Sequence, residues 1–170
     1  EEVLDRASKH VSAFLDVFSD VNCTERVVQE KLGDNDKTVE KRQPTFDYLV
    51  LLSNAGGDLS LVESRVAAED DKSASKEGAP LLVSNGFSML LLIFHPYYSG
   101  GFQFALAPEA AGDSSLVAVN FQFIPGSRSL AALSVRGREY PLALSGTAWI
   151  DPRSGAIRKI AARIGAEMED

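Results

Sequence analysis

The feature that most constrains this chain is a β-hairpin predicted over residues 146–160, which include the only tryptophan, Trp149. Strand-forming residues flank a turn on both sides. In this turn Pro152 presets its own φ angle, Asp151 can accept hydrogen bonds from the backbone ahead of it, and Gly155 can adopt a positive φ. Two antiparallel strands and their connection are therefore expected here.

The position of the turn also predicts which side chains share a face. With the loop at residues 151–154, Trp149 lies opposite Ala156. One face then carries Ser145, Thr147, Trp149, Arg158, Ile160, Ala162 and Ile164. Lys159 and Arg163 fall on the opposite face, which we expect to be solvated. The arginine of the first face would lie beside the Trp149 ring, as a cation–π or capping contact rather than a ligand anchor.

The N-terminal residues 2–19 predict a long amphipathic helix. Apolar residues recur there at steps of three and four, as expected for one face of a helix. They are Val3, Leu4, Ala7, Val11, Phe14, Leu15 and Phe18. Since no other long segment has this pattern, the apolar stripe is expected to pack on a sheet rather than on a second helix.

Most other apolar segments have the length and alternation of strands, and short turns separate them. The predicted strands, besides the late hairpin, are residues 22–32, 46–53, 59–68, 102–107 and 116–124, while 127–135 leave strand and loop open. The connections are too short for crossover helices, so the strands are expected to pair antiparallel. Turns are predicted at 34–36 and 54–58, and a polar surface loop at 69–78.

The most apolar stretch covers residues 81–104, and Asn85-Gly86 within it has two interpretations. As a two-residue turn it would form a hairpin, whereas as a helix start Asn85 would be the N-cap. The segment after it favours a helix running towards His95, because Met89 and its neighbours are straight-chain residues, do not alternate, and precede Pro96. A short helix that is apolar on all sides must be enclosed by the sheet or fill a cavity.

Size and charge narrow the class of protein. With 170 residues, of which 45% are hydrophobic, a single domain over residues 1–170 is expected. A net charge of −7 argues against a nucleic-acid partner, which would need clustered Lys and Arg. No apolar run approaches the roughly 20 residues of a membrane-spanning helix. The first residues of the sequence given show no signal peptide.

The residue types that carry most enzyme chemistry are few. His10, His95 and Cys23 are far apart in sequence, so no metal site and no cofactor are expected. A hydrolase centred on His95 would require a serine and a carboxylate gathered around it. His95 instead follows Phe94 at the predicted end of an element. We therefore expect no catalytic residues and no enzyme activity.

The order of elements and the late hairpin resemble a known family. The sequence Gly-Thr-Ala-Trp-Ile-Asp-Pro-Arg-Ser-Gly-Ala-Ile-Arg-Lys-Ile at 146–160 is similar to a late hairpin in the LolA-like superfamily of bacterial periplasmic lipoprotein carriers. The chain looks closer to the uncharacterised exported bacterial relatives than to the carrier itself. The resemblance implies an α+β fold in which the long N-terminal helix packs on a strongly curved antiparallel sheet, an unclosed half-barrel with the short apolar helix inserted near its middle. It also implies a periplasmic or secreted protein.

These observations together predict a non-enzymatic exported binding protein. Its apolar half-barrel cavity would hold a lipid-like or other hydrophobic ligand, for example a lipid or the acyl chain of a lipoprotein. The expected lining residues are Phe87, Leu91, Phe94, Tyr97 and Trp149. The alternative is a structural or protein-interaction domain with a filled core and no small-molecule ligand.

Overall fold

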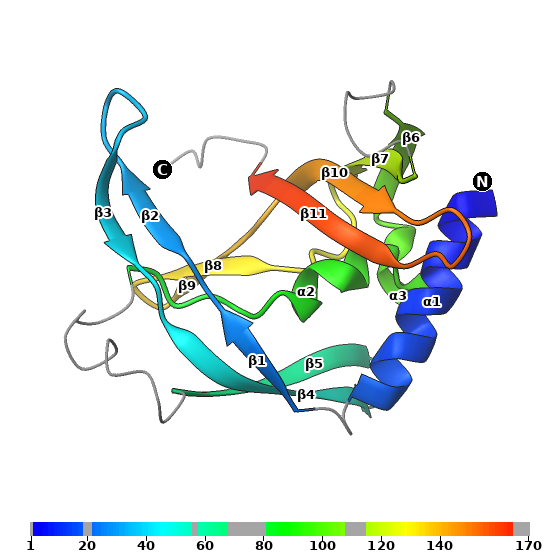
Figure 1. The fold of residues 1–170 in the computed structure, drawn as a ribbon, viewed down its shortest axis with the longest axis horizontal. Helices are drawn as coiled ribbons and strands as arrows, with labels where there is room; N and C mark the ends of the chain where they lie inside the picture. Colours follow the sequence, from blue (N-terminus) through cyan, green and yellow to red (C-terminus); the bar gives the residue numbers. More distant parts are fainter. Residues whose placement is uncertain (1, 19–21, 56–57, 68–80, 108–114, 165–170) are drawn as a thin grey trace. The chain divides into compact units, whose positions relative to one another are not determined.

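A computed structural model describes residues 2–18, 22–55, 58–67, 81–107 and 115–164 (Figure 1). The predicted polar loop at 69–78 lies outside these residues, as does the middle of the predicted turn at 54–58. The chain forms two compact units, one of residues 1–15 with 88–170 and the other of residues 16–87. Within the described residues, no helix combines the length and the apolar composition needed to cross a bilayer.

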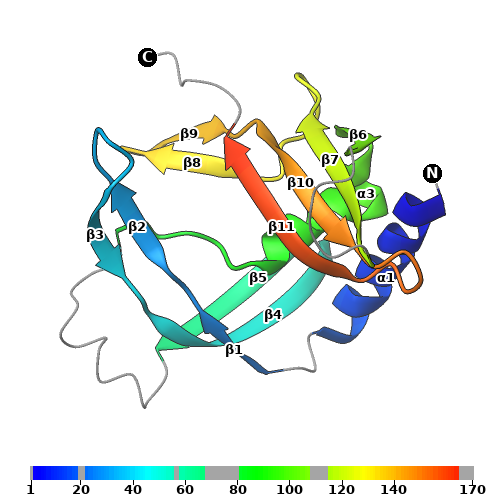
Figure 2. The ribbon, with the colours of Figure 1, turned by 45° about the horizontal axis from the view of Figure 1, so that its top comes forward.

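The first unit contains an antiparallel sheet whose strands follow the order β11-β10-β7-β6 (Figure 2). Its strands are β6 (Phe102–Leu106), β7 (Val117–Phe123), β10 (Leu144–Ile150) and β11 (Ile157–Ile164). The hairpin of β8 (Ala132–Val135) and β9 (Arg138–Pro141) precedes β10. Short helical segments precede β6, namely α2 (Ser88–Leu91), the 3-10 helix η1 (Leu92–Phe94) and α3 (Pro96–Ser99).

The core of the first unit is aromatic. The ring of Phe94 in η1 lies 5.4 Å from the ring of Phe104 and 6.2 Å from that of Phe121, both on the apolar face of the sheet. The Phe102 ring adds an edge-to-face contact with Phe121 at 6.2 Å. Such pairs add about 1 kcal/mol each to the burial of their area. They hold the helical segment against this face.

The N-terminal helix α1 (Glu2–Phe18) confirms the prediction for residues 2–19. Ala7, Val11 and Leu15 on its apolar stripe are buried. Within the first unit, the loop between β10 and β11 packs against its first turns, where Arg6 donates a hydrogen bond to the carbonyl of Pro152. The late hairpin is therefore joined to the opposite end of the sequence.

The apolar segment is helical, as predicted, but it begins later. Asn85-Gly86 forms no hairpin turn, and helix starts at Ser88. The helical run ends at Phe94, and His95 then caps α3, its Nδ1 accepting a hydrogen bond from the Tyr97 amide at 3.2 Å. His95 thus ends one element and begins the next, because Pro96 fits the first turn of a helix and not its interior.

The turn of the late hairpin has the predicted chemistry. Gly155 has φ +76°. The Asp151 Oδ1 accepts hydrogen bonds from the backbone N–H of Arg153 at 2.8 Å and of Ser154 at 3.3 Å. These backbone bonds are the main reason that the pKa of Asp151 is held below its ordinary value.

The predicted register of this hairpin is wrong. Trp149 pairs with Lys159 and Ile150 with Ile157, with a β-bulge between them. The loop lies one residue further along than predicted, because the Asp151 amide donates to the Ala156 carbonyl at 2.9 Å and leaves residues 152–155 between the paired residues. The bulge makes the slip beyond it an odd number of residues, so the β11 side chains from Lys159 onward lie on the other face from the one predicted.

The corrected register exchanges the neighbours of the tryptophan. Lys159, rather than Arg158, lies over the Trp149 ring, with its Nζ 4.7 Å from the ring centroid. Arg158 instead lies 3.8 Å from the Asp151 carboxylate. Lys159 and Arg163, predicted to lie on the face opposite Trp149, share its face.

The second unit contains a sheet in the order β1-β4-β5 and a separate hairpin, β2-β3. The strands are β1 (Cys23–Arg26), β2 (Gln29–Leu32), β3 (Thr38–Arg42), β4 (Thr45–Ala55) and β5 (Asp58–Ala67). The single strand predicted over 22–32 is thus two strands in different sheets. The chain leaves the β1-β4-β5 sheet at Val27, whose amide donates to the Pro44 carbonyl at 3.0 Å.

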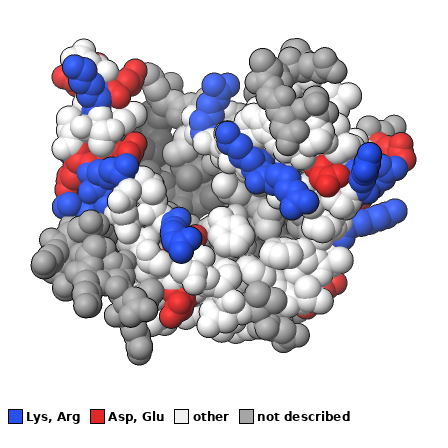
Figure 3. Space-filling model, viewed as in Figure 1, with Lys and Arg blue, Asp and Glu red and all other residues white. Residues whose placement is uncertain are grey.

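The β2-β3 hairpin is charged on its surface, with both signs represented (Figure 3). Lys41 lies 3.0 Å from Glu30, and Arg42 lies 2.6 Å from Glu40. The turn predicted at 34–36 is confirmed, with φ +55° at Asp36. Exposed pairs of this kind contribute at most about 1 kcal/mol each, so the hairpin has a solvated surface rather than a charged site.

The fold is mixed α+β with antiparallel sheets that do not close, as predicted. The prediction of a single, strongly curved sheet is wrong. The described strands form four separate sheets, one of four strands, one of three and two of two strands each. One cause of the division is that the chain bends out of the β1-β4-β5 sheet at residues 27–28. The other is that, among the described strands, β2 pairs only with β3 and β8 only with β9.

Candidate binding surface

The structure does not gather all the predicted lining residues at one place. Phe94 is buried, with 2% of its surface exposed, and packs on the apolar face of the four-stranded sheet. Trp149 lies on the other face of that sheet, because it alternates with the inward-facing Ala148. Leu91 ends α2 and is half-buried.

The remaining predicted residues lie elsewhere. The Tyr97 ring stands edge-on to the ring of Tyr98, with 4.8 Å between the ring centroids. The Arg128 guanidinium lies 5.2 Å from the centroid of the Tyr97 ring. Phe87 belongs to the second unit, where its ring packs 5.4 Å from that of Tyr48. The two hollows described below are lined by none of the predicted residues.

The face of the four-stranded sheet that carries Trp149 is polar, and we call it the polar face. Its side chains form rows across the strands, because residues paired in register point to the same side. The first row is Gln103, Gln122, Ser145 and Arg163; the second is Ala105, Asn120, Thr147 and Ala161; the third is Ala118, Trp149 and Lys159. None of these residues is acidic.

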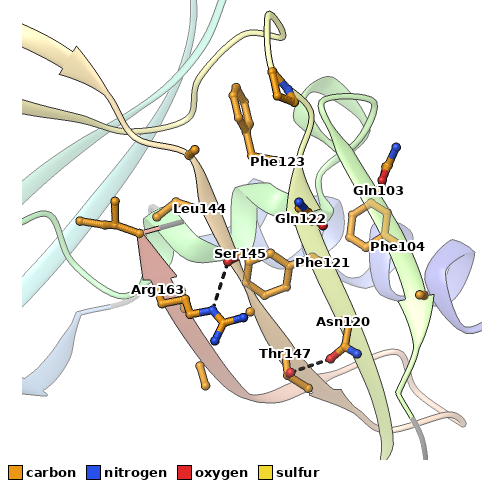
Figure 4. A pocket seen from close by; sticks show the side chains of 17 residues that line it. Gln103, Phe104, Asn120, Phe121, Gln122, Phe123, Leu144, Ser145, Thr147 and Arg163 are labelled. Carbon is orange, nitrogen blue, oxygen red and sulfur yellow. Dashed lines mark hydrogen bonds between the residues drawn. The ribbon is translucent and has the colours of Figure 1, made fainter. Parts of the chain in front are cut away.

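Hydrogen bonds position two pairs of side chains in these rows (Figure 4). The Arg163 Nε donates to the Ser145 Oγ at 3.4 Å. The Thr147 Oγ1 donates to the Asn120 Oδ1 at 2.7 Å. The first bond uses one of the five guanidinium N–H groups, and the second fixes which end of the Asn120 amide is its donor. The polar face therefore presents oriented donors.

A hollow of about 1210 Å³ lies against this sheet, and 17 residues line it. The lining includes the whole first and second rows of the polar face. Arg163 is the only charged residue among the 17. Phe123 and Leu144 lie towards one end of the group, and Asn120 and Thr147 towards the other (Figure 4). The lining thus includes the polar side chains of the first two rows with one cation, and residues such as Phe123 and Leu144 whose side chains belong to the apolar face.

A second hollow of about 590 Å³ lies in the other unit, beside the β2-β3 hairpin. Its lining includes Gln29, whose side chain is already engaged. The Gln29 Oε1 accepts from the Leu81 amide at 2.9 Å, and its Nε2 donates to the Leu82 carbonyl at 2.6 Å. The amide of Gln29 therefore holds the protein's own chain, and this hollow is the weaker candidate.

The second unit contains a cluster of three charged side chains, Glu25, Glu63 and Arg65, which form hydrogen bonds to the protein's own backbone. The Arg65 Nη2 donates to Glu25 at 2.9 Å and to the Asn85 carbonyl at 3.1 Å. Glu25 accepts from the Phe87 amide at 3.2 Å, and Glu63 accepts from the Gly86 amide at 2.9 Å. These bonds secure the segment before α2, so the cluster is structural.

Among the described residues, no group of three or more His, Cys, Asp or Glu side chains is placed to hold a metal ion. Burial, and secondarily the charge of Glu25, raise the pKa of the Cys23 thiol above its ordinary value. A raised pKa keeps the thiol protonated, which is the opposite of what a nucleophilic cysteine needs.

Sequence reasoning missed the polar face as a site. The alternation in residues 116–124 is enough to place Asn120 and Gln122 on one side of their strand. The error lay in β11, where the predicted register put Arg163 on the wrong side of the hairpin. The signal that could have revealed the site is the concentration of amides, hydroxyls and alanines on one parity of several strands.

The chain was also compared with known proteins. No protein-family model, no curated protein and no solved structure matches it. The resemblance of residues 146–160 to the LolA-like superfamily therefore stays a prediction.

Proposed function

We propose that this chain is a non-enzymatic binding protein that holds an anionic ligand against the polar face, with Arg163 as the partner of the negative charge. The observation that carries the proposal is that Arg163 is the only charged residue among the described residues that line the hollow. A guanidinium can bind a carboxylate through two parallel hydrogen bonds. Ser145 orients Arg163 at 3.4 Å, and uncharged donors surround it.

The ion pair alone gives moderate affinity. Arg163 is exposed, so water and salt screen its charge, and such a pair contributes up to about 1 kcal/mol. The remaining affinity must come from hydrogen bonds to the amides and hydroxyls of the first two rows and from burial of ligand surface in the hollow. Binding should weaken as salt is added.

Arg163→Gln is expected to weaken the binding of octanoate, a simple carboxylate probe, about fivefold, because about 1 kcal/mol of charge interaction is lost. Isothermal titration at low salt measures this. Arg153→Gln is the matched control, since it removes the same charge from the exposed turn outside the hollow. Equal affinities of the Arg163→Gln and Arg153→Gln variants would contradict the assignment of Arg163.

A lipid-like ligand is the second candidate, and the apolar residues among those lining the hollow favour it. Phe123, Leu144 and Ile164 lie on the apolar face of the sheet, and Ile164 has 54% of its surface exposed. The acyl chain of a fatty acid would cover Ile164 on that face. The lipid-like ligand predicted from the sequence therefore remains a candidate, with other contact residues than those predicted.

Saturable binding of a fluorescent fatty-acid analogue to the delipidated protein is expected under this second candidate. Ile164→Glu should weaken it at least about tenfold, since burial of an isoleucine contributes about 2 kcal/mol and the new carboxylate repels the ligand. Leu106→Glu, on β6 and outside the hollow, is the control. Absence of saturable binding contradicts the lipid candidate. If octanoate also fails to bind, the protein-interaction alternative stands.

A further inference from the structure

We infer that the ligand of the polar face is an acidic oligosaccharide that lies across the strands, with about one sugar unit over each of β6, β7, β10 and β11. The inference rests on the proposed function and names the class of its ligand. It uses the first row of the polar face, in which Gln103, Gln122, Ser145 and Arg163 stand side by side on four paired strands.

Spacing is the first argument. Neighbouring strands lie about 4.8 Å apart, so the first row offers a polar side chain at each step over about 14 Å. One pyranose unit of an extended sugar chain has nearly the same length as this step. A chain laid across the strands therefore meets a new amide or hydroxyl at every unit, whereas a peptide strand or an acyl chain has a different repeat.

The second argument is the kind of polar group. The amides of Gln103 and Gln122 each offer a donor and an acceptor, which suits neighbouring hydroxyl groups of a sugar ring. Asn120 and Thr147 in the second row add a pair whose geometry is fixed by their 2.7 Å hydrogen bond. Ala105 and Ala161 fill the rest of that row. Their small side chains leave room for the thickness of a ring.

Charge is the third argument, and it decides where the acidic unit lies. The net charge of the chain is −7, yet the described residues of the three rows include no carboxylate, so the rows themselves do not repel an anion. Arg163 ends the first row on β11, and the rest of that row is uncharged. One uronic acid over β11 satisfies this arrangement. A nucleic acid would need a cation for most of its phosphates.

The test compares three probes on the full chain by isothermal titration. They are a tetrasaccharide of three xyloses and one glucuronic acid, the neutral xylotetraose, and octanoate. We expect the acidic sugar to bind about fivefold more tightly than the neutral one, the contribution of one exposed ion pair. Arg163→Gln should remove that difference.

Gln122→Ala separates the sugar from other anions. It should weaken both sugars about fivefold, the value of one hydrogen bond, and weaken octanoate less, because an acyl chain offers the Gln122 amide no hydroxyl group. Asn35→Ala, in the β2-β3 turn of the other unit, is the control for loss of an exposed amide. Circular dichroism of each variant checks that the sheet is intact.

The outcomes distinguish this inference from the proposed function. Octanoate binding that depends on Arg163, with no binding of either sugar, keeps the proposed function and overturns the oligosaccharide. Sugar binding that is indifferent to both Arg163 and Gln122 overturns both. Failure of all three probes also overturns both.

Discussion

Gly155→Ala is expected to destabilise the unit that carries the polar face by about 3 kcal/mol. Gly155 has φ +76°, which costs an alanine about 1 kcal/mol. Its Cβ would also lie 2.4 Å from the carbonyl oxygen of Arg6 and 2.8 Å from the amide nitrogen of Ala7. Both are backbone atoms of α1 and cannot rotate away, so overpacking adds about 2 kcal/mol.

Gly126→Ala and Gly137→Ala separate the backbone strain of a positive φ from the overpacking against α1. These glycines have φ +83° and +80°, but an added Cβ would have no atom within 4 Å at either position. They should therefore show only the backbone strain of about 1 kcal/mol. Urea unfolding followed by the fluorescence of Trp149, which lies in β10, reports on this unit. Equal losses in all three variants would show that the hairpin loop does not press on α1.

Gly86→Ala is expected to have a similar effect on the second unit, again about 3 kcal/mol. An added Cβ would lie 2.2 Å from the Oη of Tyr48 and 2.4 Å from its Cζ. Tyr48 is fully buried, and its hydroxyl donates a hydrogen bond to Glu63. The same carboxylate accepts from the Gly86 amide, so neither partner can move without losing a bond.

Gly100→Ala is the matched control for this prediction. Gly100 has φ −64°, and an added Cβ there has no neighbour within 4 Å. Its effect should stay within about 0.5 kcal/mol. Hydrogen exchange of residues 45–67 measures the loss in the second unit directly, since the tryptophan lies in the other one. Unchanged protection in the Gly86→Ala variant would contradict the close approach of this segment to Tyr48.

Local pattern was sufficient for many of the elements. The helix over 2–18 followed from apolar steps of three and four, and the strand over 117–123 from strict alternation. The Gly155 turn followed from residue chemistry. In each case the deciding interactions lie within a few residues along the chain, so they can be read without the rest of the fold.

The candidate site could not be predicted in the same way. Its key residue, Arg163, was assigned to the wrong side of the hairpin because a β-bulge after Trp149 changes the register. The sequence 146–160 allows more than one position for the loop. In the fold the loop is shifted by one residue, and Gly155 lies against the backbone of Arg6 and Ala7.

By itself, then, the sequence determined an α+β chain with an N-terminal helix, antiparallel strands and a helical apolar segment before β6. Only the tertiary structure decided that the strands divide into separate sheets, and that Arg163 stands in one row with Gln103, Gln122 and Ser145. The physical reason is that side-chain periodicity acts along one strand. The face that a strand presents depends on its register with distant neighbours, and a slip by one residue reverses it.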